Sequence, residues 1–353
     1  MRKLTVNLGA KSYHIEIGAH ILSTLGEKIA GLSNAERVAI ISDDTVDALY
    51  GETLAASLRA AGFVPTRIVF AHGEQSKCLA VLADIYEAMQ AAGLTRSDLV
   101  VTLGGGVTGD LGGFAAATFL RGIDFVQVPT TLLAQIDSSI GGKVAVDLPA
   151  GKNLVGNFYQ PKGVFIDTEL LRTLPVHFLH DGLGEAIKYG CLADAELFEL
   201  LEGYQDDEEL LANIDNVISR CCAIKARIVE HDEFDTGERM LLNFGHTLGH
   251  AIEKCSHFEG ISHGEAVGVG MLMLTEQSEG LGLTELGSAE RLKALLAKYA
   301  LPTATEFSAP ELLAAIGADK KKSGKSITLV LMKAIGQCYL HKIAMQDLPA
   351  YVR

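Results

Sequence analysis

The sequence lacks the features that mark several common classes of protein. Its six cysteines include no CxxC pair, which argues against a disulfide framework or a zinc knuckle and favours reduced thiols. Positive charge is scarce, because 30 Lys and Arg face 44 Asp and Glu, for a formal net charge of -14. That balance excludes binding to nucleic acid or to an anionic membrane through a broad basic surface. Any anionic ligand would therefore need a locally basic pocket.

Long apolar runs are also missing, and none reaches the length that a membrane-spanning helix needs. Residues 1–8 alternate like a strand and have neither the apolar centre of a signal peptide nor the Arg and Ser bias of a transit peptide. We therefore expect a cytoplasmic protein. A chain of 353 residues is too long for one comfortable hydrophobic core, so two domains are expected.

The first half alternates short β-rich runs with helical stretches, as in βα units on a mostly parallel sheet. After Pro175 the pattern changes to helical periodicity over 208–230, 240–254 and 265–279, with one late hairpin over 327–332 and 337–341. We predict an α/β domain over 1–174 and a mainly α-helical domain over 175–353. The predicted strands of the first domain are 4–8, 13–17, 37–41, 66–70, 99–103, 125–128 and 163–166.

A glycine-rich turn follows the predicted strand 99–103. Gly104, Gly105 and Gly106 end this strand and open a helix, so backbone amides there can reach a phosphate. An isolated glycine triplet is just as typical of a tight turn with no ligand, and neither GxGxxG nor GxxxxGK[ST] is present. The turn alone does not decide between these two interpretations.

Polar residues follow two neighbouring strands. Asp43 and Asp44 come after the strand 37–41, where a carboxylate can accept hydrogen bonds from a ribose. After the next strand comes the loop His72, Gly73, Glu74, Gln75, Ser76 and Lys77. Polar residues and glycines thus follow several strands at one edge of the predicted sheet. This pattern favours a nucleotide-binding site.

Histidines with helical spacing lie in the second half. His246 and His250 are one turn apart in NFGHTLGHAIE, and His263 follows at a predicted helix start. Glu185 lies in an apolar helical context, where an unpaired carboxylate is costly. Two or three imidazoles with one carboxylate suit a catalytic zinc, although such a pair also arises by chance among 11 histidines. Spacing does not say whether His250 is a ligand or a nearby base.

Cations accompany every motif despite the acidic composition. These are Arg121, Lys143, Lys152, Lys188, Lys225, Arg239 and the run Lys320 to Lys322. Most lysines of such a run are solvated, but a carboxylate or phosphate ligand would give the other cations a reason to converge.

Six motifs occur in an order and spacing that cover nearly the whole chain. The chain resembles the 3-dehydroquinate synthase family in GGGVTGD, QIDSSIGGK, GKNLVGNFYQP, GEAIKYG, NFGHTLGHAIE and HGEAVGVGM. Glycerol dehydrogenases and iron-dependent alcohol dehydrogenases share the glycine triplet and the histidine pair, but not GKNLVGNFYQP or GEAIKYG. After Lys143 the family usually continues with Thr-Gly or Thr-Ala and then Val-Asn, whereas this chain has Val144, Ala145, Val146 and Asp147.

The resemblance assigns roles to individual residues. It implies that Glu185, His246 and His263 hold a divalent metal, zinc or cobalt, while His250 serves proton transfer or substrate contact. The implied NAD contacts are Asp43, His72, Gly73, Glu74, Gln75, Ser76, Lys77, Gly105, Gly106, Val107, Thr108, Gly109, Asp110, Thr130, Thr131, Lys143, Lys152, Leu171, Arg172, Thr173 and Leu174. The implied substrate contacts are Arg121, Asp137, Lys143, Asn153, Lys188, Lys225, Arg239, Asn243, His250 and Lys321.

The implied reaction converts 3-deoxy-arabino-heptulosonate 7-phosphate to 3-dehydroquinate and phosphate, with transient reduction of NAD. A homodimer that binds a small anionic sugar phosphate is expected. Two other activities remain open: a related sugar phosphate cyclase whose substrate lacks the carboxylate, and a metal-dependent polyol dehydrogenase. Arg239, Asn243, His250 and a late lysine favour the substrate that carries a carboxylate.

Overall fold

The computed structural model describes residues 1–257, 259–320 and 325–352. Contacts divide the chain into two compact units. The first comprises Met1–Leu174 and Ile214–Phe234, and the second comprises Pro175–Asn213 and Asp235–Arg353. In the described part of the chain, no helix combines the length and the apolar character needed to cross a bilayer.

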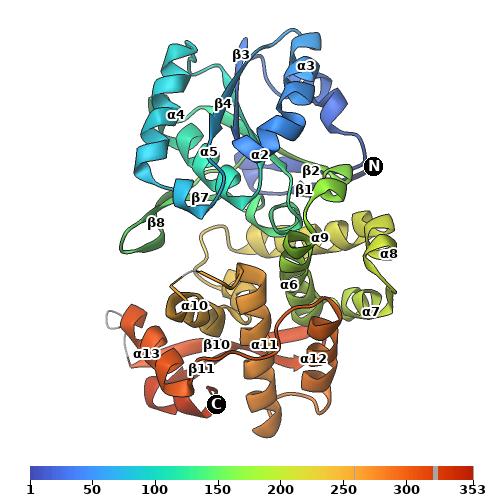
Figure 1. The fold of residues 1–353 in the computed structure, drawn as a ribbon, viewed down its shortest axis with the longest axis vertical. Coiled ribbons are helices and arrows are strands. Elements are labelled where there is room, and N and C mark those ends of the chain that lie inside the picture. Colours follow the sequence, from blue (N-terminus) through green and yellow to red (C-terminus); the bar gives the residue numbers. More distant parts are fainter. Residues whose placement is uncertain (258, 321–324, 353) are drawn as a thin grey trace. The chain divides into compact units, whose positions relative to one another are not determined.

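A seven-stranded sheet forms the centre of the first unit, and Figure 1 labels its strands β1 to β4. The order of the strands is β1-β2-β9-β6-β5-β3-β4. All neighbouring pairs are parallel except β1 with β2. The mostly parallel sheet expected from the sequence is confirmed. The strands are β1 (Arg2–Val6), β2 (Tyr13–Gly18), β3 (Arg37–Asp43), β4 (Val64–Phe70), β5 (Leu99–Gly104), β6 (Asp124–Pro129) and β9 (Gly163–Asp167).

Both faces of this sheet are covered, as the alternation along β3 shows. Val38 and Ile40 belong to a core with α1 and α3, whereas Ala39 and Ile41 belong to a core with α4 and α5. The helices of this unit are α1 (Leu25–Ala30), α2 (Asp44–Val46), α3 (Glu52–Ala60), α4 (Leu79–Ala91), α5 (Gly106–Thr118) and α9 (Ile214–His231). Short helical turns occupy Gly9–Lys11, Leu22–Thr24, Asp47–Gly51, Glu74–Ser76, Phe119–Arg121, Ala134–Ser138 and Thr168–Thr173.

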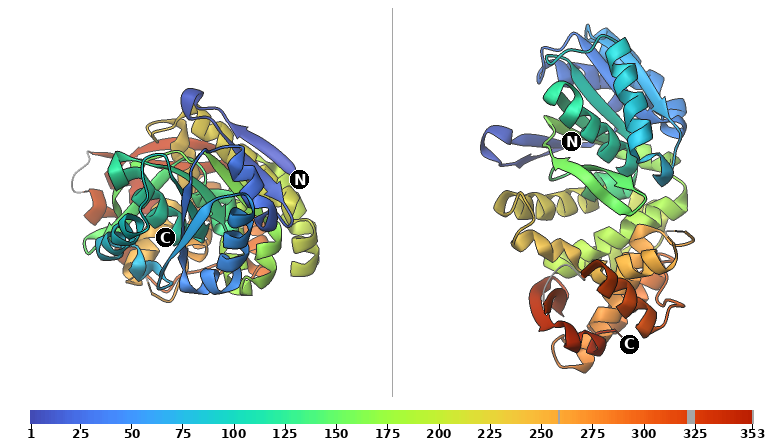
Figure 2. Two further views of the ribbon diagram at one scale, coloured as in Figure 1. Left: turned by 90° about the horizontal axis from the view of Figure 1, so that it is seen from above. Right: turned by 90° about the vertical axis from the view of Figure 1, so that its left-hand side faces the viewer.

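Two features of the first unit differ from the sequence-based expectation. The residues around Lys143 and Lys152 form an antiparallel hairpin of β7 (Lys143–Leu148) and β8 (Gly151–Phe158), drawn in green in Figure 2. The predicted helix 208–230 is two helices, α8 (Asp207–Ala212) and α9 (Ile214–His231), separated at Asn213. Helix α9 groups with the first unit because it packs against β1 and the turn Ala134–Ser138.

The second unit is mainly helical, as expected. It contains α6 (Val176–Ala193), α7 (Ala195–Gly203), α8 (Asp207–Ala212), α10 (His246–Cys255), α11 (His263–Gly280), α12 (Ser288–Lys298) and α13 (Ala309–Lys320). The predicted late hairpin is present as β10 (Ser326–Ala334) and β11 (Gln337–Ala344). Short helical turns span Glu238–Asn243 and Met345–Ala350. The predicted helix 240–254 is interrupted at Gly245, whose left-handed φ of 80° precedes α10.

Candidate functional site

The glycine turn of the first unit joins β5 directly to α5. Gly105 is the N-cap of α5, and a Cβ added there would lie 3.1 Å from Cγ2 of Thr131. The Thr130 N–H donates to the Gly104 carbonyl over 3.0 Å. Thr130 and Thr131 therefore lie against the turn. This is consistent with the prediction that both threonines and the turn contact NAD. Backbone amides at the start of this helix can bind a phosphate.

Asp43 and Asp44, which the sequence could not separate, have different partners. The Asp43 carboxylate caps α2 by accepting from the Val46 N–H, and its Oδ2 lies 3.3 Å from Oγ1 of Thr108 on α5. The Asp44 carboxylate instead contacts the ring of His72 over 2.8 Å. Only Asp43 thus joins a strand end to the helix that follows the glycine turn, which fits a ribose-binding role.

Lys77 is hydrogen-bonded to two other predicted residues of the first unit. Its Nζ donates to Asp110 Oδ2 over 2.5 Å and to Asn153 Oδ1 over 2.6 Å, and the residue is only 4% exposed. Burial opposes the charged amine, but the carboxylates of Asp110 and Glu74 outweigh burial and raise the pKa of Lys77. Lys77 is therefore a buried cation next to the predicted phosphate-binding turn.

Three predicted cations of the first unit are at least partly exposed. Lys152 approaches Glu74 over 3.8 Å, Lys143 is exposed at the start of β7, and Arg121 is exposed with a left-handed φ of 71°. In the segment 171–174, the hydroxyl of Thr173 is hydrogen-bonded to that of Tyr50.

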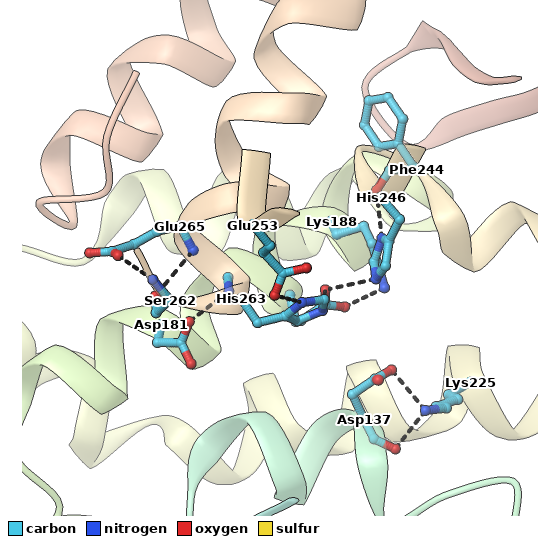
Figure 3. Close-up of polar contacts among 12 residues, drawn as sticks. Asp137, Asp181, Lys188, Lys225, Phe244, His246, Glu253, Ser262, His263 and Glu265 are labelled. Carbon is cyan, nitrogen blue, oxygen red and sulfur yellow. Dashed lines mark hydrogen bonds and ion pairs between the residues drawn. The ribbon is translucent and has the colours of Figure 1, made fainter. Parts of the chain in front are cut away.

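Asp137 and Lys225 form an ion pair within the first unit (Figure 3). Nζ of Lys225, on α9, lies 2.8 Å from Oδ1 of Asp137 and also donates to the Asp137 carbonyl over 2.5 Å. The two predicted substrate contacts are therefore adjacent in the structure.

Three helices of the second unit bring the predicted metal ligands together. Glu185 lies within α6, whereas His246 and His263 are the first residues of α10 and α11. The start of α11 is fixed by a capping box between Ser262 and Glu265 and by the Gly264 N–H, which donates to Asp181 Oδ1 over 2.6 Å. The position of His263 thus follows from local sequence signals.

Glycines allow these helices to approach closely. A Cβ added at Gly184 of α6 would lie 2.5 Å from the Gly264 carbonyl oxygen of α11. A Cβ at Gly270 would lie 2.2 Å from the Gly245 carbonyl oxygen and 2.9 Å from the Gly249 nitrogen. Backbone therefore packs on backbone at both helix pairs, which sets the separation of the three ligand side chains.

The three side chains converge on a small volume. Nε2 of His246 and Nε2 of His263 each lie 3.6 Å from Oε1 of Glu185, and the ligand atoms are all within 4.8 Å of one another. Glu185 is completely buried and in ion-pair contact with Lys188. Among the described residues, Oε1 has no hydrogen-bond partner, although an unsatisfied buried carboxylate oxygen is costly. One carboxylate and two imidazoles around this oxygen fit a divalent metal such as zinc.

The outer nitrogens of both rings have partners, which leaves each Nε2 directed at Glu185. Nδ1 of His246 lies 3.2 Å from the Phe244 carbonyl oxygen, and Nδ1 of His263 lies 3.4 Å from Oε1 of Glu253 (Figure 3). Metal-binding histidines commonly have such partners, because these fix the ring and its tautomer. The sequence interpretation did not include Glu253, although it stands three residues after His250 in NFGHTLGHAIE.

The pKa values of His246 and His263 are shifted in opposite directions. Burial, with the nearby charge of Lys188, lowers the pKa of His246 far below its ordinary value, so its ring is neutral and has a lone pair to offer. Burial alone would lower the pKa of His263, but its hydrogen bond to Glu253 and the charge of Glu185 raise it instead. A metal ion binds the neutral form of an imidazole, so metal binding at His263 competes with protonation of its ring.

A cavity of about 290 Å³ adjoins the cluster within the second unit. Asn243, His246 and His250 line one part of it, and α13 and the β10–β11 hairpin contribute apolar residues. His250 is exposed, with its ring centre 5.4 Å from that of His246, whereas the predicted contact Arg239 is buried. His250 also belongs to a second convergent group with Glu253 and His263. Lys321, the remaining predicted substrate contact, lies outside the described residues.

The first unit has a glycine turn at a strand end, and the second unit has a Glu-His-His cluster. These two features together are typical of enzymes that bind a nucleotide and a metal. The family models 3-dehydroquinate synthase N-terminal and 3-dehydroquinate synthase C-terminal match residues 67–181 and 182–322. The chain belongs to the 3-dehydroquinate synthase family.

Relatives with this name are similar over nearly the whole chain. The 3-dehydroquinate synthase of Clostridium acetobutylicum is 52% identical, with 100% of this chain and 99% of the relative covered. That of Clostridium botulinum is 49% identical, with 96% and 97% covered.

Solved structures extend the similarity to other cyclases. A 2-deoxy-scyllo-inosose synthase complexed with carbaglucose-6-phosphate, NAD+ and Co2+ has a TM-score of 0.86 and 25% identity, covering 100% of this chain and 99% of its own. The 2-epi-5-epi-valiolone synthase of Streptomyces hygroscopicus, with NAD+ and Zn2+ bound, has a TM-score of 0.85 and 28% identity, covering 96% and 95%. The glycerol dehydrogenase of Schizosaccharomyces pombe, at 20% identity and a TM-score of 0.62, shares the fold alone.

Proposed function

We propose that this chain is an NAD- and metal-dependent carbon–oxygen lyase that converts 3-deoxy-arabino-heptulosonate 7-phosphate to 3-dehydroquinate and phosphate. The observation that carries the proposal is the convergence of His246 and His263 on the buried, unsatisfied Oε1 of Glu185. Membership of the 3-dehydroquinate synthase family supports the choice of this reaction. We further infer that the enzyme acts in the cytoplasm as a homodimer.

The cofactors supply two kinds of chemistry. When bound, NAD would supply reversible hydride transfer, and zinc or cobalt would supply Lewis acidity at a substrate hydroxyl. Glu185, His246 and His263 would hold the metal. Asp43, Lys77 and the glycine turn would bind NAD, with the remaining contacts from His72, Gly73, Glu74, Gln75, Ser76, Gly105, Gly106, Val107, Thr108, Gly109, Asp110, Thr130, Thr131, Lys143, Lys152, Leu171, Arg172, Thr173 and Leu174.

The chain's own side chains bind and orient the substrate. Lys143, Lys188, Asn153 and Arg121 would hold the phosphate that leaves, so part of the rate enhancement comes from positioning by cations. Arg239 and Asn243 would bind the substrate carboxylate, together with Lys321. Asp137 and Lys225, already paired, would contact the substrate as a unit.

His250 is the residue we assign to proton transfer. It is exposed and lines the cavity beside His246, and histidine is the side chain that most often serves as a general acid or base. Neighbouring Asn243 lines the same cavity, so a substrate bound through its carboxylate would lie within reach of the His250 ring.

The overall reaction tests this proposal by its redox balance. Purified enzyme with NAD and metal should consume the heptulosonate phosphate and release one phosphate per turnover, with no lasting change in nicotinamide absorbance, because the hydride is returned. Continuous absorbance and a phosphate assay on one sample measure both. Stoichiometric accumulation of NADH would instead mark a polyol dehydrogenase. Turnover of glucose 6-phosphate without use of the carboxylate substrate would mark a related cyclase.

Glu253 should support metal binding through His263. Glu253→Gln removes the negative charge that faces Nδ1 of His263, so zinc affinity should fall by about 10–100-fold, the usual effect of changing such a partner. Competition with a chelating dye measures this affinity without reference to activity. Glu276→Gln, the same change at an exposed position of α11, is the control and should leave zinc affinity unchanged. Equal affinities of the two variants would remove Glu253 from the metal site.

A further inference from the structure

The β7–β8 hairpin contains an irregularity at Asp147. Val146 lies opposite Val155 and Leu148 opposite Gly151, and the register shifts between Val146 and Leu148. At this shift the backbone N–H of Asp147 donates to the Lys77 carbonyl over 2.7 Å, and Asp147 forms an isolated parallel bridge with Cys78. One residue therefore attaches the hairpin to the segment that precedes α4.

The side chain of Asp147 makes a second attachment. Its Oδ1 accepts a hydrogen bond from the Asn153 N–H over 2.7 Å. Asn153 has a left-handed φ of 56°, a conformation that asparagine adopts more readily than most residues, and the bond to Asp147 helps to hold it there. The side-chain Oδ1 of Asn153 in turn accepts from Nζ of Lys77 over 2.6 Å. Asn153 is thus fixed at its backbone by Asp147 and at its amide by Lys77.

Asp147, Asn153, Lys77 and Asp110 consequently form one continuous chain of hydrogen bonds. Asp147 touches Asn153 through its carboxylate and Lys77 through its backbone, and its charge is among those that raise the pKa of Lys77. The proposed function uses Asn153 for substrate and Lys77 for NAD. It gives no role to Asp147, which joins them.

We propose that Asp147 is a positioning residue that sets the orientation of the substrate contact Asn153 and the cofactor contact Lys77 together. This inference rests on the proposed function for the roles of those two residues. The essential group is the acceptor oxygen of the side chain, because that oxygen holds the left-handed Asn153 backbone. An asparagine side chain at position 147 would offer the same acceptor oxygen without the charge.

The test compares Asp147→Ala with Asp147→Asn in the full chain. Alanine keeps the backbone bond to Lys77 but loses the acceptor, whereas asparagine keeps both. We expect D147A to raise the KM for the heptulosonate phosphate and the Kd for NAD by about tenfold each, the effect of one lost hydrogen bond to a charged group, with a smaller change in kcat. D147N should remain close to wild type in both constants.

A second readout needs no activity. In the ligand-free protein, amide hydrogen exchange over 149–158 should be faster in D147A than in wild type and unchanged in D147N, since the Asn153 N–H loses its acceptor only in D147A. If D147A does not fold, D147S replaces it with the same expectations, because the shorter serine side chain places its oxygen farther from the Asn153 N–H.

Each outcome supports or overturns the inference. Wild-type KM and Kd in D147A would overturn it, as would a D147N variant that is as defective as D147A, because the acceptor would then be irrelevant. A fall in kcat alone with both binding constants unchanged would also overturn it. If the wild-type enzyme fails to turn over the heptulosonate phosphate, the proposed function fails. The NAD titration and the exchange measurement still decide whether Asp147 holds Asn153 and Lys77.

Discussion

His246→Ala should lose zinc and activity together, whereas His250→Ala should keep zinc and lose about 10²–10⁴-fold in kcat, the usual contribution of a general acid or base. The difference follows from position: Nε2 of His246 faces the unsatisfied Oε1 of buried Glu185, whereas His250 is exposed and lines the neighbouring cavity. Elemental analysis after dialysis gives the zinc content, and the phosphate assay gives kcat.

One control variant and one alternative outcome make this comparison decisive. His177→Ala changes an exposed histidine on α6 and should leave both zinc content and kcat at the wild-type level. His250, Glu253 and His263 also converge, so a metal held by that group would be lost from His250→Ala and retained by His246→Ala. Equal loss of zinc from both variants would show that the two histidines share the ligand role.

Sequence patterns located those parts of the site that depend on local signals. The strands predicted over 37–41 and 99–103 end at Asp43 and Gly104, and the helix start predicted at His263 has a capping box of Ser262 and Glu265 in the structure. The choice between Asp43 and Asp44 needed the structure, because adjacent carboxylates at a strand end look alike until their partners are known. Here Thr108 and His72 separate them.

The hairpin of the first unit was missed although its pattern is present. No strand was predicted between 128 and 163, although Val144 and Val146 alternate with a strand's period of two. Both valines are buried in the core with α4 and α5, so tertiary packing overrides the flexibility of the glycines. Asp147 follows Val146 directly, so its role as an acceptor became visible only once the hairpin was known.

Helix periodicity shows that a helix has an apolar face but does not identify the partner of that face. Helix α9 has such a face, and the sequence assigned it with its neighbours to the second domain. Its contacts with β1 and with the turn Ala134–Ser138 group it with the first unit, where Lys225 meets Asp137. The pairing of these two residues is a long-range fact that no local pattern contains.

The packing partners of the glycines in the second unit are likewise not identified by any local pattern. One of these glycines leads to a prediction with a large effect. Glycine clusters in the sequence indicated close approach of backbone to another group, and in α10 and α11 that group is the neighbouring helix. Gly270→Ala places a Cβ 2.2 Å from the Gly245 carbonyl oxygen, so α10 must shift. We expect the free energy of unfolding of the second unit to fall by about 1–3 kcal/mol or more.

Gly268→Ala is the matched control, two residues earlier on the same buried stretch of α11. Its Cβ would meet only the terminal Cδ2 of Leu296 at 3.0 Å, and a flexible side chain can move. Because alanine also favours the helix by about 1 kcal/mol over glycine, this variant should be neutral or stabilised. Amide hydrogen exchange in α10 and α11 reports the stability of this unit by itself.

Zinc affinity should fall in Gly270→Ala and not in Gly268→Ala, because a shift of α10 moves His246 relative to Glu185 and His263. Titration with a chelating dye measures this affinity while exchange measures stability on the same preparations. The opposite outcome is that Gly270→Ala matches Gly268→Ala in both amide hydrogen exchange and zinc affinity. Backbone contact between α10 and α11 would then not set the geometry of the metal ligands. Loss of stability with unchanged zinc affinity would confine the role of Gly270 to packing, since the ligands would then hold their places without close contact between the helices.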